Sequence, residues 1–130
     1  MWQVEYDLIV PWLDALDDRS VAHIFAALEL LEREGPALGR PLVDTIKGSS
    51  LSNMKELRPA SSGSSEIRIL FVFDPNRKAV LLLGGDKAKA KNGKAKWSNW
   101  YKQAIPKAEA LYWRYLSEMG DSDVRSERLP

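Results

Sequence analysis

The sequence predicts an α+β fold, in which helices cover one face of a small, mainly antiparallel sheet. Three observations support this prediction. Residues 2–8, 54–58 and 67–73 divide into two alternating sets, as on the two faces of a β-strand, and at 2–8 one set is apolar and the other polar. Two longer segments, at 20–34 and beyond residue 97, repeat apolar residues every three or four positions, as helices facing a core do. Three expected strands follow one another with short connections, which favours antiparallel hairpins.

The first half of the chain is expected to contain one strand and one helix. The opening strand, at residues 2–8, is ended by a proline. The segment Asp17–Ser20 offers side chains that can cap a helix N-terminus, and glycine and proline at 35–36 stop that helix. The following segment, 36–52, is rich in glycine, proline and serine. We therefore expect a loop there, with one short helical turn near 42–46.

The second half is expected to contain three strands. A short strand at 54–58 is followed by a serine-rich hairpin connection at 61–65. The next strand, 67–73, is apolar on both faces except at Arg68, so it should be central. A turn at 74–77 leads to a returning strand at 79–83, which runs into two glycines.

A long amphipathic helix should close the domain. Residues 87–96 are too polar to pack and predict a loop. Apolar residues then recur with helical spacing up to Met119. Pro106 suits the first turn of this helix, or else it lies inside a longer helix that starts near Trp97. Residues 120–130 show no periodicity, so we expect a single domain at 1–119 and a flexible tail.

Composition excludes several kinds of site. The chain has 130 residues, no cysteine and one histidine, so thiolate and multi-histidine metal sites are excluded. We therefore expect neither a metal nor a cofactor. No apolar run approaches the roughly 20 residues of a membrane span. The expected location is the cytoplasm, without membrane attachment.

Charge is balanced overall but uneven along the chain. Residues 1–35 contain eight acidic and two basic residues, whereas 36–130 contain 17 basic and ten acidic residues. Such asymmetry favours an anionic partner for the basic part, although a solvated lysine-rich loop would look the same. The candidate contacts to an RNA backbone are Lys89, Lys91, Lys94 and Lys96.

Arg68 is the most informative residue. An arginine in an otherwise apolar central strand needs a partner. One interpretation is a structural ion pair, with Glu56 or Asp86 as the carboxylate. The other is a cation that binds phosphate in a cleft. In that case Arg58 and Lys87 would complete a cationic cluster, and Trp100 and Tyr101 would stack on bases. Such a cluster suits RNA cleavage by attack of the 2′-hydroxyl.

Four short segments together resemble toxins of the RelE/ParE superfamily, and in particular its phage-derived Gp49-like, HigB-type branch. They read NMKELR at 53–58, IRILF at 67–71, LLGGDK at 82–87 and WYKQAIP at 100–106. The resemblance implies a RelE-like α+β toxin that cleaves mRNA on the ribosome. It also implies an antitoxin partner, in this branch usually of the helix-turn-helix type.

The resemblance also implies roles for individual residues. Arg58 and Arg68 match the paired arginines of the central strands, and Lys87 matches the cation after the last strand. The general base would be Glu56 or Asp86, and the acid Lys87 or Tyr101. Two alternatives to a ribosome-dependent nuclease stay open, namely a ParE-like inhibitor of DNA gyrase and an inactive relative that binds RNA or protein.

Overall fold

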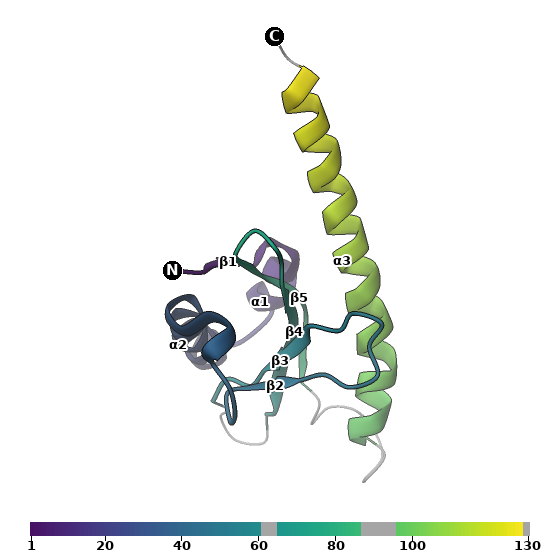
Figure 1. Ribbon diagram of the computed structural model, residues 1–130. Helices are drawn as coiled ribbons and strands as arrows, with labels where there is room; N and C mark the ends of the chain where they lie inside the picture. The colour runs from purple at the N-terminus through teal and green to yellow at the C-terminus, as the bar shows by residue number, and fades with distance from the viewer. Residues whose placement is uncertain (61–64, 87–95, 129–130) are drawn as a thin grey trace.

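A five-stranded sheet forms the middle layer of the fold, in a computed structural model that describes residues 1–60, 65–86 and 96–128 (Figure 1). The strand order is β1-β5-β4-β3-β2. Neighbouring strands pair antiparallel, except that β1 runs parallel to β5. The central position predicted for the apolar strand β4 is confirmed. The strands are β1 (Gln3–Glu5), β2 (Val43–Thr45), β3 (Met54–Leu57), β4 (Ile67–Phe73) and β5 (Lys78–Asp86).

Among the described residues, three α-helices and two short 3₁₀ helices surround this sheet. The capping predicted within 17–20 is confirmed at the start of α2 (Asp18–Glu34), since the Asp17 carboxylate accepts a hydrogen bond from the Ser20 backbone N–H. Gly35 follows its end with a φ of 55°, and a Cβ there would overlap the indole of Trp2. The helices are α1 (Val10–Asp14), α2 (Asp18–Glu34), α3 (Lys96–Arg128), η1 (Asp7–Ile9) and η2 (Gly35–Ala37).

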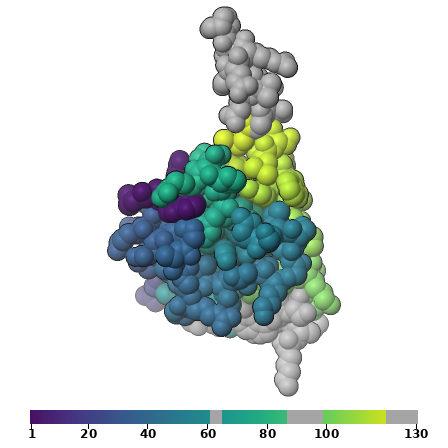
Figure 2. Space-filling model, viewed as in Figure 1, coloured from purple at the N-terminus to yellow at the C-terminus, as the bar shows by residue number. Residues whose placement is uncertain are grey.

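The helices cover both faces of the sheet, so the expectation of a single covered face is wrong. One core joins α1 and α2 to alternate residues of β4 and β5, such as Phe71 and Leu81. A second core joins α3 to the intervening residues, such as Val72 and Leu82. Both sets of side chains are apolar, and each needs its own cover. In the space-filling view, the blue surface of α2 and the green-to-yellow surface of α3 lie on opposite sides of the molecule (Figure 2).

Two short elements differ from the prediction. The opening strand ends at Glu5, and the residues that follow form η1 and α1, which bury Ile9 and Leu13. The loop and helical turn expected at 36–52 include a strand instead, because β2 pairs with β3 and forms the sheet edge. A strand of three residues is too short to show a period in the sequence.

The last helix is longer than its apolar repeat. α3 begins at Lys96 and contains Pro106 in its interior, which confirms the second of the two interpretations of that proline. The helix continues to Arg128, through the stretch expected to form a tail. Within the described part of the chain, no helix combines the length and the apolar character that crossing a membrane requires.

Two tryptophans pack against adjacent glycines of β5 from opposite sides. A Cβ on Gly84 would overlap the indole of Trp12 from α1. A Cβ on Gly85 would lie 2.6 Å from Nε1 of Trp100 on α3, closer than real contacts allow. Close packing therefore explains this pair of glycines.

Candidate active site

A cleft of about 650 Å³ opens between the β2–β3 edge of the sheet and the first turns of α3. On β3, Met54 faces α3 within the apolar core, and the alternation of the strand brings Glu56 to the same face where that core ends. Tyr101 and Ile105 on α3 line the opposite wall. The charged residues that line the cleft are Arg40, Asp44, Lys47, Glu56, Arg58, Lys102 and Glu109.

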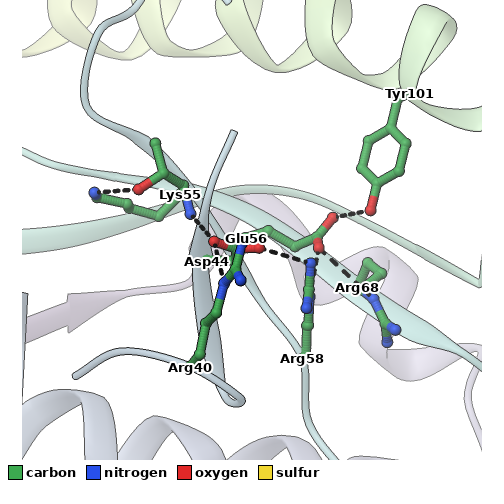
Figure 3. Close-up of polar contacts among 8 residues, drawn as sticks. Arg40, Asp44, Lys55, Glu56, Arg58, Arg68 and Tyr101 are labelled. Atoms are coloured by element: carbon green, nitrogen blue, oxygen red, sulfur yellow. Dashed lines mark hydrogen bonds and ion pairs between the residues drawn. The ribbon is translucent and has the colours of Figure 1, made fainter. Parts of the chain in front are cut away.

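Glu56 is the centre of the polar network in this cleft (Figure 3). It is only 1% exposed. Its Oε2 accepts a hydrogen bond from the Tyr101 hydroxyl, and its Oε1 accepts one from Arg58 Nε at 2.8 Å. Arg68 Nε lies 3.8 Å from the same Oε1, within ion-pair range but beyond a hydrogen bond. The buried charge is therefore compensated from three sides, as burial requires.

Arg58 connects this buried carboxylate to a more exposed one. Its Nη2 donates a hydrogen bond to Asp44 Oδ2 at 3.1 Å, while its Nε binds Glu56. The hydrogen bond to Glu56 is the main cause that raises the pKa of Arg58. Arg58 is thus a fixed cation whose side chain is one-third exposed to the cleft.

Arg68 lies deeper than Arg58. Its side chain is 15% exposed, and its Nη1 donates a hydrogen bond to the Ile67 carbonyl at 2.8 Å. It is not among the described residues that line the cleft. Of the two interpretations left open by the sequence, the ion pair with Glu56 therefore matches the geometry better than a cation open to the cleft.

Tyr101 provides a neutral hydroxyl beside these charges. Burial and the hydrogen bond to Glu56 raise the pKa of Tyr101 well above its usual range, and burial is the larger cause. Nearby Arg68 and Arg58 oppose this rise only in part. Tyr101 therefore keeps its proton at neutral pH, and its hydroxyl donates a hydrogen bond to Glu56.

The structure brings some of the predicted site residues together and leaves others apart. Arg58, Arg68 and Tyr101 meet around Glu56, as described above. Trp100 is partly buried, against Gly85 and edge-on to the Tyr101 ring at a centroid distance of 4.9 Å. Lys96 supplies the first residue of α3. The remaining predicted lysines lie outside the described residues: Lys87, Lys89, Lys91 and Lys94.

The other candidate base, Asp86, lies at the end of β5. Its Oδ1 accepts a hydrogen bond from the backbone N–H of Glu66 at 2.9 Å. It does not belong to the described lining of the cleft, whereas Glu56 does. The geometry therefore favours Glu56.

Arg40 and Asp44 are among the charged residues of the cleft that sequence reasoning missed. Both belong to the segment expected to be a loop, and Asp44 in fact lies on β2. β2 pairs with β3 and so places Asp44 opposite Glu56. The available signal was their spacing of four residues, which is common in surface ion pairs and did not point to this cleft.

Comparison with known proteins gives consistent results. The family described as phage-derived protein Gp49-like matches residues 11–113. The Mycobacterium tuberculosis protein named "Putative toxin HigB2" is 46% identical over 127 residues, or 98% of this chain. A second protein of that organism, named "Putative toxin HigB3", is 51% identical over 106 residues, or 82% of this chain. The matches span 60% of the first relative and 85% of the second.

Proposed function

Because the chain belongs to the phage-derived Gp49-like family, in its HigB-type branch, we propose that it is the toxin of a type II toxin–antitoxin system. The observation that carries this proposal is the identity of 46–51% to two proteins named as HigB toxins. The proposed partner is a cognate antitoxin, of the helix-turn-helix type, that blocks the toxin.

We further propose that the toxin inhibits translation by cleaving mRNA on the ribosome. Such cleavage needs a base for the 2′-hydroxyl proton, a cation for the charged phosphorane, and an acid for the leaving 5′-oxygen. The cleft offers one residue of each kind: Glu56 accepts hydrogen bonds from both Arg58 and Tyr101.

In this mechanism the Glu56 carboxylate accepts the 2′-hydroxyl proton. The 2′-oxygen attacks phosphorus, the bond from phosphorus to the 5′-oxygen breaks, and a 2′,3′-cyclic phosphate forms. Arg58 stabilises the negative charge that grows on the phosphoryl oxygens. The Tyr101 hydroxyl carries its proton before the reaction, and it gives this proton to the departing 5′-oxygen. Arg68 acts through Glu56 as a positioning residue.

Induced expression tests the proposal. The wild-type chain should arrest growth, and co-expression of the neighbouring antitoxin gene should restore it. New mRNA 5′-ends should appear inside translated codons, and Tyr101→Phe should reduce them. Arg114→Ala on the exposed side of α3 is the matched control and should behave as wild type.

Two outcomes would contradict the proposed activity. Growth arrest with intact mRNA and inhibited DNA gyrase would support the gyrase inhibitor instead. Unaffected growth, with the folded protein present, would point to an inactive relative.

A further inference from the structure

In the cleft lining, one carboxylate is shared between two arginines. Asp44 Oδ1 lies 3.1 Å from Arg40 Nε, and Asp44 Oδ2 lies 3.1 Å from Arg58 Nη2 (Figure 3). All three residues line the cleft. Two oxygens of a single anion therefore each bind one guanidinium group.

A phosphodiester presents the same pattern to proteins. Its two non-bridging oxygens carry one negative charge, and guanidinium groups bind them with charge-assisted hydrogen bonds. The Asp44 carboxylate thus occupies a position that a backbone phosphate would suit. Hydrogen bonds from Arg40 and from the Thr45 backbone N–H lower the pKa of Asp44, so its charge persists at neutral pH.

The contacts of Asp44 also allow an exchange of anions. The Arg40 side chain is 76% exposed, and exposed ion pairs contribute little to stability. The Thr45 backbone N–H donates a hydrogen bond to Asp44 Oδ1 at 2.9 Å, which is independent of either arginine. Asp44 can therefore lose its contacts with both arginines and still keep one hydrogen bond, from the Thr45 backbone N–H on β2.

We propose that Arg40 and Arg58 form a subsite for an RNA backbone phosphate, and that Asp44 fills this subsite when RNA is absent. The inference rests on the proposed function and deepens it. Arg40 becomes a substrate-binding residue, and Asp44 becomes an internal competitor that lowers affinity for RNA.

Binding of a fluorescent single-stranded 2′-O-methyl RNA tests this subsite. The probe lacks the attacking hydroxyl, so its affinity is measured without cleavage. Asp44→Asn keeps the shape and the acceptor for Thr45 N–H, and it should bind the probe roughly threefold to tenfold more tightly at low salt. Arg40→Ala should weaken binding by a similar factor. In the double variant, the gain from Asp44→Asn should shrink.

A second ion pair with the same spacing supplies the control. Arg114 and Glu118 on α3 are also four residues apart, and Arg114 is exposed to the same extent as Arg40. Glu118→Gln removes one negative charge outside the cleft and should leave affinity within about twofold of wild type.

The possible outcomes separate this inference from the proposed function. Weaker or unchanged binding by Asp44→Asn would overturn the inference, because Asp44 would then orient Arg58 or have no role. An equal gain with Glu118→Gln would overturn it too, because only net charge would matter. Failure of the proposed function would appear separately, as absence of growth arrest and mRNA cleavage by the wild-type chain.

Discussion

Glu56 sets the charge balance of the cleft, because three side chains converge on one buried carboxylate. Removing a single partner should leave the other two in place. Loss of a partner from a fully buried ion pair costs about 3–5 kcal/mol. The contact from Arg68 is the longest of the three, at 3.8 Å, so its removal should cost less.

The first prediction concerns Arg68→Ala. We expect the free energy of unfolding in urea to fall by about 1–2 kcal/mol, because Glu56 loses one of its cations. Arg114→Ala, which removes an exposed arginine, should change it by less than about 0.5 kcal/mol. Unchanged or increased stability together with lost activity would instead indicate an arginine that faces phosphate directly.

The second prediction concerns Tyr101 and alkaline pH. The pKa of Tyr101 is raised in the folded protein, so the hydroxyl contributes stability that is fully present below its ordinary pKa of 10.0. This contribution is lost as pH rises above that value. The unfolding free energy of the wild type should therefore fall more steeply above pH 10 than that of Tyr101→Phe. A variant of an exposed tyrosine, Tyr6→Phe, should keep the wild-type slope.

At the scale of elements, the contact between β5 and α3 leaves no room for a side chain at Gly85. The third prediction is that Gly85→Ala lowers the free energy of unfolding by about 1–3 kcal/mol, because Trp100 must move away from the strand. Gly39→Ala is the control, since a Cβ there meets nothing within 4 Å. Equal effects of the two substitutions in urea unfolding would contradict this close packing.

Long elements, in which a periodic pattern repeats several times, could be predicted from the sequence, whereas the short elements could not. α2 has 17 residues with apolar positions at helical spacing, and β4 has seven residues that are apolar except at Arg68. In both, the local sequence already favours the structure that the tertiary contacts stabilise. β2 has three residues and depends on its pairing with β3. The same limit applies to the cleft, because Asp44 in its lining lies on β2. The resemblance pointed to Arg58, Arg68 and Lys87, and Tyr101 was one of two candidate acids, but nothing local placed Asp44 beside Arg58.

At the scale of the whole molecule, the acidic first part of the chain supplies the helices on one face of the sheet. The acidic first 35 residues supply α1 and α2, which cover the face of the sheet opposite to α3. The cleft lies on the α3 side. The acidic residues of α1 and α2 therefore lie on the other face from the proposed RNA site, where they would repel a phosphate backbone least.

The fourth prediction tests where the folded domain ends. The α3 residues that pack in the second core extend from Trp100 to Leu116. A chain shortened to residues 1–119 keeps all of them, so its unfolding free energy should stay within about 0.5 kcal/mol of wild type. Tyr112→Ala, which opens a space in that core, should cost about 3–5 kcal/mol. A large loss on shortening would extend the domain towards Arg128.

Because β1 pairs with the distant strand β5, this pairing can form only late in the synthesis of the chain. The first strand gains its partner only after residues 78–80 have been synthesised. Glu56 gains Tyr101 only when the chain has grown 45 residues beyond Glu56 itself. A growing chain that has not passed α3 therefore has no complete cleft. If the protein acts on ribosomes as proposed, the ribosome that translates it is spared until the proposed catalytic residues have come together.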